Sequence, residues 1–449
     1  MSAELSARAI SETEKVDKVR ALQRVLYRSA KQDPTRRFHA LYDKVARSDV
    51  LWRAWVEVAK NQGAPGIDGV TIASIEDGGT DGVKVFLDGL AAALTDKTYR
   101  PKALRRVHIP KPGKPGQTRP LGIPTVADRV VMSAAKIVLE PIFEADFSPQ
   151  SFGFRPKRSA HQALEAIRVA ANRGANWVLD ADIKACFDEI DHDALIGQVE
   201  RRVVDGAMLK LLRSWLRAGV FEGGLVSDTE SGTPQGSPIS PLLANIALHV
   251  IDEAWAKAAN LGTLVRYADD FVVLTTSRSR AEEAKHRIEE VLVGLGLRLH
   301  PDKTRIINLQ GGKDGFDFLG FHHRMTPSRF GTRRYLSKWP SDRAMAALRA
   351  KIRDRTSRHL ASRELRHVVA ELNAVLRGWG AYFRYGNSNR KFALIDSYVH
   401  LRLSKLASVK YATRGRLRAS RFNYGWLTEL GIHRLTGRVK RWTPAHAWR

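Results

Sequence analysis

Apolar residues recur at helical spacing in several parts of this chain. Near the N-terminus, residues 12–31 place Val16, Val19 and Leu26 on one side of a predicted helix. Asp33-Pro34 ends it, because the residue before proline avoids helical geometry. Four later stretches show the same spacing, and they are residues 38–61, 127–142, 159–173 and 281–294.

Alternation of apolar and polar residues predicts strands in the middle of the chain. In residues 177–183, Asp180 and Asp182 alternate with apolar neighbours, so both carboxylates are expected on one face of a strand. Apolar segments also flank Tyr267-Ala268-Asp269-Asp270, which predicts strand, tight acidic turn and strand. Further strand-turn-strand units are predicted over residues 107–124 and 297–307, and residues 316–321 are expected to close the β region.

After Pro340 the pattern becomes helical again. The expected helices are residues 342–358, 362–379 and 389–410, with aromatic residues packed among them and arginines outside.

Length and composition narrow the class of protein. The chain has 449 residues, enough for two or three domains. The single cysteine, Cys186, excludes an internal disulfide and a multi-cysteine zinc site, and fits a reducing cytoplasm. No apolar run of eighteen residues predicts a membrane helix, and residues 1–10 lack the apolar core of a secretory signal.

The positive charge is concentrated at one end of the chain. The net charge is +27, of which residues 324–449 carry +23 and residues 1–323 only +4. A basic region this polarised predicts a polyanionic partner, and nucleic acid is favoured. A solubilising face is the alternative, although mixed signs would serve that purpose better.

The adjacent carboxylates Asp269 and Asp270 need an explanation, because like charges at a strand turn repel each other. A divalent cation would offset the repulsion, and Mg²⁺ is commonly held by one or two carboxylates plus substrate phosphates. A plain surface turn is the alternative.

Glycine- and proline-rich loops separate the predicted elements. Residues 61–70 form a shaped loop, and residues 111–119 form a basic hairpin tip that suits a phosphate clamp or a solvated turn. Residues 151–159 interleave aromatic and basic side chains, a pattern suited to stacking and phosphate contact. Residues 231–246 lead into an apolar helix with Pro241 in its first turn.

The ordered series of these motifs resembles the bacterial group II intron reverse transcriptase/maturase family. The series has Asp182 at a strand end with Phe187 five residues on, then Pro-Gln-Gly at 234–236, the Tyr-Ala-Asp-Asp turn, Lys303 and Phe-Leu-Gly at 318–320. Four fuller matches are Pro-Gly-Ile-Asp-Gly at 65–69, Arg-Pro-Leu-Gly-Ile-Pro at 119–124, Phe-Gly-Phe-Arg-Pro at 152–156 and Gly-Thr-Pro-Gln-Gly at 232–236. Residues 376–383 resemble its maturase (thumb) domain, and the resemblance covers roughly residues 40–440.

The resemblance implies a fold of the α+β class, a right-hand polymerase with fingers, a palm built on an antiparallel sheet, and a helical thumb/maturase domain. The implied boundaries are an N-terminal helical extension at 1–60, fingers at 61–175, palm at 176–325, thumb at 340–412 and a basic tail at 413–449. It also implies an RNA-directed DNA polymerase, a nucleotidyltransferase of a mobile element that acts in the bacterial cytoplasm.

Roles for single residues follow from the same resemblance. Two Mg²⁺ ions would be bound by Asp182, Asp269 and the backbone carbonyl of Ile183, with Asp270 in support. The implied nucleotide-binding residues are Lys111, Arg119, Phe187, Gln235 and Gly236, and Phe187 would exclude a ribose 2′-hydroxyl. The implied nucleic-acid contacts are Arg155, Lys157, Lys303, Arg377 and Arg384. The tip from Lys111 to Arg119 is longer than the family's spacing, so Lys114 is an alternative to Lys111 as the lysine that reaches the triphosphate.

The expected partners are an RNA template, a DNA primer, dNTPs, group II intron RNA bound for RNA splicing and retrohoming, and target DNA, with no membrane. The chain ends at residue 449 without the His/Cys-rich nuclease of many relatives, so priming on target DNA would need another source such as a replication fork.

Three alternatives remain open from the sequence. One is an RNA-binding maturase with an idle polymerase site, which the intact Asp182, Asp269 and Asp270 argue against. Another is a related reverse transcriptase recruited to CRISPR or defence, and the third is a DNA-templated repair polymerase.

Overall fold

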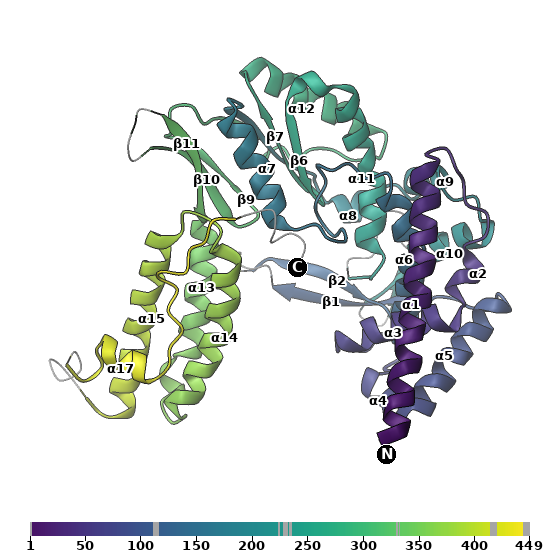
Figure 1. The fold of residues 1–449 in the computed structure, drawn as a ribbon, viewed down its shortest axis with the longest axis horizontal. Helices are drawn as coiled ribbons and strands as arrows, with labels where there is room; N and C mark the ends of the chain where they lie inside the picture. The colour runs from purple at the N-terminus through teal and green to yellow at the C-terminus, as the bar shows by residue number, and fades with distance from the viewer. Residues whose placement is uncertain are drawn as a thin grey trace.

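The computed structural model describes residues 2–110, 116–222, 225–227, 232, 236–328, 331, 333–413 and 420–442, with the backbone alone for residues 2–16, 226 and 259. The elements form an arch, with N-terminal helices in one arm, the central sheet at the top and the helices after Pro340 in the other arm (Figure 1). The basic tip at 111–115 lies outside the described residues, as does Gln235.

The N-terminal arm is a helical layer built around α6 (Val126–Glu144). Helices α1 (Ser2–Gln32) and α3 (Ser48–Lys60) pack against α6, which is buried around most of its circumference. A helix that is apolar on most sides needs such cover. The other helices of this arm are α2 (Tyr42–Val45), α4 (Ile72–Glu76) and α5 (Gly79–Thr95).

The prediction of one continuous helix over residues 38–61 was wrong. The chain leaves helical geometry at Arg47, whose ψ is 133°. The Arg47 guanidinium pairs with Asp49 at 2.6 Å, in the first turn of α3. The backbone amides of Leu41 and Tyr42 donate to the carboxylate of Asp205, which anchors the start of α2 from another part of the chain.

The central sheet has the strand order β6-β7-β3-β8 with antiparallel neighbours. Its strands are β3 (Trp177–Asp182), β6 (Thr263–Tyr267), β7 (Asp270–Thr275) and β8 (Arg305–Asn308). The predicted hairpin around the acidic turn is therefore confirmed. Residues 297–300 were predicted as a strand but make only an isolated bridge, between Leu299 and Ile183.

Helices cover both faces of the central sheet. On one face, Leu179 and Val273 join a core with Ile288 of α12 (Arg278–Val293). On the other face, Val178 and Val272 pack with α7 (Ala160–Asn172). Asp180 and Asp182 share strand parity with Val178, so the second face carries the carboxylates. As predicted, Ser159 caps α7, through a capping box with Gln162.

A second sheet, β2-β1-β4-β5, lies below the first in Figure 1. Strands β1 (Leu104–Pro110) and β2 (Thr118–Ile123) form the predicted hairpin, and β4 (Val220–Glu222) joins β1 in parallel. Strand β5 (Leu225–Ser227) is at the edge. Along the chain, β3 is followed by α8 (Cys186–Glu189), α9 (His192–Glu200) and α10 (Gly206–Leu216). Strand β5 is followed by α11 (Ser240–Lys257) and η1 (Ala259–Leu261). Pro241 sits in the first turn of α11, as predicted.

The β region does not close at residue 321, contrary to the prediction. A third sheet, β11-β10-β9, continues it through β9 (Gly315–Phe318), β10 (Phe321–Pro327) and β11 (Arg334–Pro340). The buried residues of β10 are Phe321, His323 and Met325. Because a histidine stands among them, the apolar alternation that predicts a strand is incomplete in the sequence.

Helices complete the second arm. They are α13 (Asp342–Arg355), η2 (Arg358–Leu360), α14 (Leu365–Phe383), α15 (Asn389–Lys410) and α17 (Tyr424–Glu429). The three predicted helices of this region are confirmed, with shifted ends for the first two. Among the described residues, no helix has the length and apolar character to cross a membrane.

Candidate active site

Asp182 and Asp270 lie opposite each other at one end of the central sheet. Strand β3 ends at Asp182, strand β7 begins at Asp270, and the two residues are partners in the β3–β7 register. Directly opposite residues point to the same face. The structure therefore brings together two carboxylates that are far apart in the sequence.

Asp269 lies beside this pair in the turn between β6 and β7. Tyr267 pairs with Asp270, so Ala268 and Asp269 form a two-residue turn, and Ala268 has a φ of 58°. Burial raises the pKa of Asp269, and the neighbouring Asp182 carboxylate adds to that shift. The cationic groups of Arg119 and Lys303 act in the opposite direction.

Asp270 is the most strongly perturbed of the three carboxylates. It keeps exposed surface at the start of β7. The protein packed around its carboxyl, together with the charges of Asp269 and Asp182, raises its pKa to about 7. A shift in this direction means that the ionised form of Asp270 is disfavoured, by burial first and by the two neighbouring carboxylates second.

Cations partly neutralise the two carboxylates of β3. Lys303 Nζ donates to Asp182 Oδ2, and the Arg305 guanidinium pairs with Asp180 at 3.0 Å. Burial raises the pKa of Asp180, and Arg305 opposes that shift. The structure thus places Lys303 on a carboxylate of the site, where sequence reasoning expected it near nucleic acid.

The described nucleotide-binding candidates surround these carboxylates. Arg119 is exposed on β2 and close enough to act electrostatically on Asp269. Gly236 has a φ of 108° and lies against β2, where an added Cβ would meet the Gly122 carbonyl at 2.8 Å. Phe187 is half-buried on α8, after the left-handed turn at Ala185.

Gly232 is held against the segment that carries Phe187. The Gly232 amide donates to the Ile190 carbonyl at 2.8 Å, and a Cβ on Gly232 would meet the Phe187 carbonyl at 2.7 Å. His192 is buried, and its Nε2 contacts the Gly232 carbonyl at 2.7 Å.

Sequence reasoning missed Arg266, which lies one residue before Tyr267. Its side chain has no exposed surface and pairs with Asp252 at 2.5 Å, which is equally buried. Burial acts to raise the pKa of Asp252, but the Arg266 guanidinium and the His249 ring together outweigh it and hold that pKa below its usual range. A charged residue directly after Leu264-Val265, in a strand otherwise rich in apolar residues, was the available signal.

Of the predicted nucleic-acid contacts, the structure contradicts Arg155. Its side chain is 3% exposed, pairs with Glu144 at 2.8 Å and donates to the carbonyls of Ser148 and Ser151. Those partners use its donors within the protein, so Arg155 holds the loop to α6 and does not face a phosphate.

The other candidates keep access to solvent. Lys157 and Arg377 are exposed. Arg384 is half-buried, donates to the Tyr385 hydroxyl at 2.6 Å and lies 4.7 Å from the centre of that ring. These three side chains remain predicted contacts.

Metal-binding potential at the site depends on the donor set. Among the described residues, no group of three or more His, Cys, Asp or Glu side chains forms a ready metal cage. Hard carboxylate oxygens from Asp182 and Asp269 nonetheless match Mg²⁺, which takes one or two carboxylates and fills its remaining positions with water and phosphate. Burial and the neighbouring carboxylates raise the pKa values of Asp269 and Asp270, and a bound cation would favour their ionised forms.

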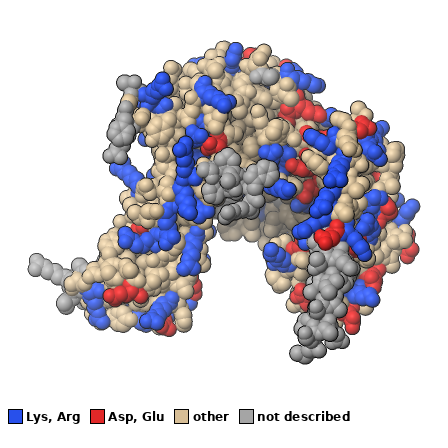
Figure 2. Space-filling model, in the orientation of Figure 1, with Lys and Arg blue, Asp and Glu red and all other residues tan. Residues whose placement is uncertain are grey.

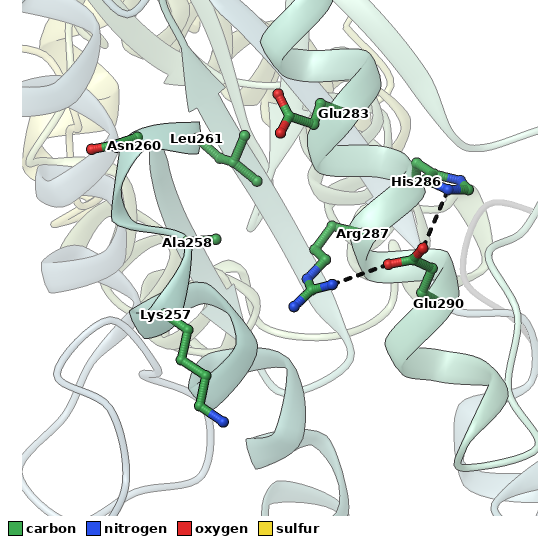
Figure 3. Close-up of a pocket in the computed structure, with 8 residues that line it drawn as sticks. All are labelled: Lys257, Ala258, Asn260, Leu261, Glu283, His286, Arg287 and Glu290. Carbon is green, nitrogen blue, oxygen red and sulfur yellow. Dashed lines mark hydrogen bonds and ion pairs between the residues drawn. The ribbon is translucent and has the colours of Figure 1, made fainter.

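A surface cavity of about 480 Å³ lies away from these carboxylates, between the end of α11 and α12 (Figure 3). Its charged groups pair with one another, since Glu290 contacts His286 at 3.3 Å and Arg287 at 3.2 Å. Nothing in this lining extends the carboxylate site.

Comparisons with known families match two parts of the chain. The family model for reverse transcriptase (RNA-dependent DNA polymerase) matches residues 109–323, which include all three carboxylates. The model for the group II intron maturase-specific domain matches residues 345–424, which cover α13 to α15.

The chain is also similar to individual proteins. Protein YkfC of Escherichia coli K12 is 33% identical over 363 residues, which cover 72% of this chain and 93% of YkfC. The group II intron-encoded protein LtrA of Lactococcus lactis is 40% identical over 217 residues, which cover 48% of this chain and 35% of LtrA. A solved telomerase from Candida albicans gives a TM-score of 0.41 at 14% identity, covering 69% of this chain and 59% of that one.

Proposed function

Because the chain belongs to the family of group II intron-encoded reverse transcriptases and maturases, we propose that Asp182, Asp269 and Asp270 are its polymerase carboxylates. The chain is an RNA-directed DNA polymerase with a maturase domain. The observation that supports the residue assignment is the register pairing of Asp182 with Asp270 beside the Asp269 turn.

Asp182 and Asp269 would hold two Mg²⁺ ions, with Asp270 in support. When bound, such ions activate the primer 3′-hydroxyl and stabilise the leaving pyrophosphate. The Ile183 carbonyl is a further candidate ligand. Ile183 forms an isolated β-bridge with Leu299. In this bridge the His300 amide donates to the Asp182 carbonyl and the Lys184 amide donates to the Arg298 carbonyl, so the bridge does not use the carbonyl of Ile183.

The nucleotide would lie between the carboxylates and β2. Arg119 supplies a positive charge for the triphosphate, and Lys111 would add a second one. Gly236 and Gln235 would line the nucleotide pocket. The close approach of Gly236 to β2 supports a narrow pocket on that side. Phe187 would pack under the sugar and reject the ribose 2′-hydroxyl, which favours dNTPs.

Template and primer would occupy the hollow of the arch. Figure 2 shows this hollow between the two arms, with Lys and Arg gathered along the inner edge of the arm that carries α13 to α15. Contacts to phosphates and 2′-hydroxyls from such a surface suit an RNA–DNA duplex and structured intron RNA. We include Lys157, Arg377 and Arg384 in this surface, and Lys303 beside the primer end.

The proposed division of the chain has an N-terminal extension at 1–60, fingers at 61–175, palm at 176–325, thumb at 340–412 and a basic tail at 413–449. The proposed partners are intron RNA, an RNA template with DNA primer, and target DNA. The bacterial relatives support action in a bacterial cytoplasm.

Primer extension on an RNA template with Mg²⁺ and dNTPs tests the assignment. Asp269→Ala should lower extension by about a thousandfold or more, because an electrostatic contribution to the transition state disappears. Asp193→Ala, which removes an exposed carboxylate from the first turn of α9, is the matched control and should extend like wild type. Equal extension by Asp269→Ala would contradict the proposal. Tight RNA binding without extension by the wild-type protein would favour a maturase that does not polymerise.

A further inference from the structure

The Arg266 guanidinium donates four hydrogen bonds to described residues, and one of them reaches the acidic turn. Its Nε and Nη2 donate to Asp252 at 3.1 and 2.5 Å. Its Nη1 donates to Asn245 Oδ1 at 3.0 Å and to the Ala268 carbonyl at 3.1 Å. The last acceptor belongs to the peptide group whose N–H is that of Asp269.

That peptide group needs support, because Ala268 has a left-handed φ of 58°. This conformation is unfavourable for an L-residue, because its Cβ crowds the backbone. The Arg266 guanidinium holds the carbonyl on one side of the peptide, and the backbone of Gly153 lies against the Ala268 amide. The direction in which Asp269 leaves the turn is therefore constrained by the side chain of Arg266 and by the 150–153 loop.

Asn245 of α11 joins these supports to one another. Its Oδ1 accepts from Arg266, and its Nδ2 donates to the Gly153 carbonyl at 2.8 Å. The same loop pairs with the backbone of Arg266, through Phe152 N to Arg266 O at 2.9 Å and Arg266 N to Gln150 O at 3.1 Å. Helix α11, the 150–153 loop and strand β6 thus form one connected frame around the turn.

A buried ion pair is weak evidence for stability, because apolar residues of similar volume often stabilise a core as well. What an apolar replacement for Arg266 could not provide is a donor for the Ala268 carbonyl. The arrangement therefore favours a positional role for the guanidinium over a purely structural one.

We propose that Arg266 is a positioning residue for Asp269, held in place by Asp252 and Asn245, and that this frame sets the affinity of the acidic turn for divalent cations. The inference rests on the proposed metal role of Asp269. Outer partners that orient a metal ligand commonly contribute 10–100-fold to metal affinity.

Binding of Mn²⁺ alone to the full-length protein, followed by electron paramagnetic resonance, tests the proposal. Asn245→Ala removes the link between Arg266 and Gly153 while leaving the Arg266–Asp252 pair intact, and Mn²⁺ binding should weaken by about tenfold. Arg266→Lys is the second variant, because lysine keeps the charge but cannot reproduce the guanidinium's fork of donors.

Asn373 on α14 offers a matched control. Like Asn245 it is buried, donates through Nδ2 to a glycine carbonyl (Gly431, 2.8 Å) and accepts through Oδ1, from the His433 amide at 2.6 Å. Asn373→Ala should lower the melting temperature about as much as Asn245→Ala, yet bind Mn²⁺ like wild type. A merely structural role for Asn245 would leave Mn²⁺ affinity unmoved in both variants.

The outcomes separate this inference from the proposed function. Weaker binding in Asn245→Ala and Arg266→Lys, but not in Asn373→Ala, supports the positioning role. Wild-type binding in the first two variants, together with loss of binding in Asp269→Ala, overturns the positioning role alone. Wild-type binding in Asp269→Ala overturns the metal assignment and the inference with it.

Discussion

Gly153 lies directly against the backbone of Ala268. A Cβ added to Gly153 would fall 2.3 Å from the Ala268 nitrogen and 2.8 Å from the Tyr267 carbonyl carbon. The absence of a side chain at position 153 is thus required for the observed position of the acidic turn.

Gly153→Ala should therefore displace the turn and lower primer extension by about tenfold or more, since a shift of about 1 Å in a reacting group can cost 10²-fold. The measurement is single-turnover extension at saturating template–primer. Gly197→Ala is the control, because its Cβ would meet nothing within 4 Å in α9 and alanine suits a helix interior. Unchanged extension by Gly153→Ala would show that the turn tolerates displacement.

Asp270→Asn should make the metal-free protein more stable at pH 7 while it lowers extension. The folded protein holds the pKa of Asp270 at about 7, above its ordinary value, so the carboxylate is strained by its neighbours when ionised. Protonated Asp270 contributes its full stabilisation of the folded state below pH about 4, and this contribution is lost as pH rises toward 7.

Thermal unfolding in EDTA measures this effect. The melting temperature of Asp270→Asn should exceed that of wild type by roughly 1–3 °C at pH 7, with the difference closing as pH falls toward 4. A lower melting temperature for the variant at pH 7 would mean that Asp270 is not strained.

Lys303→Met should move the acid limb of the extension–pH profile to higher pH. The Lys303 ammonium donates to Asp182 and acts to lower the pKa values of Asp269 and Asp270, so its removal favours their protonated forms. Lys303→Arg keeps a cation there and should retain the wild-type limb. If Lys303 instead served only the primer, Lys303→Met would raise the KM for template–primer and leave the pH limb in place.

Arg155→Ala and Lys157→Ala should differ, although the residues are two positions apart. Loss of Arg155 leaves Glu144 without its partner and should cost about 3–5 kcal/mol in the free energy of unfolding. Lys157 is exposed, so its loss should spare stability and reduce the salt dependence of RNA binding by about one phosphate contact. Denaturant unfolding and RNA titrations at several salt concentrations distinguish the two. If Arg155→Ala were as stable as wild type but bound RNA weakly, the predicted contact between Arg155 and nucleic acid would be supported after all.

Much of the fold could be predicted because its patterns are local. The helix α15 (Asn389–Lys410), the cap at Ser159 and the hairpin around Asp269 follow from apolar spacing and turn chemistry within a few residues. The errors arose where distant contacts override such patterns. Helix 38–61 breaks at Arg47, with Asp205 holding the amides of Leu41 and Tyr42.

The site divides in the same way. The residue pattern was sufficient to place Asp180 and Asp182 on one strand face and Asp269 and Asp270 at a strand turn, because side-chain direction in a strand alternates with a period of two. The packing of distant segments was needed to show that Asp182 faces Asp270, that Lys303 reaches Asp182 across 121 positions, and which partners bury Arg155 and Arg266. Local spacing sets the direction of a side chain, whereas the charge it meets depends on how remote segments pack.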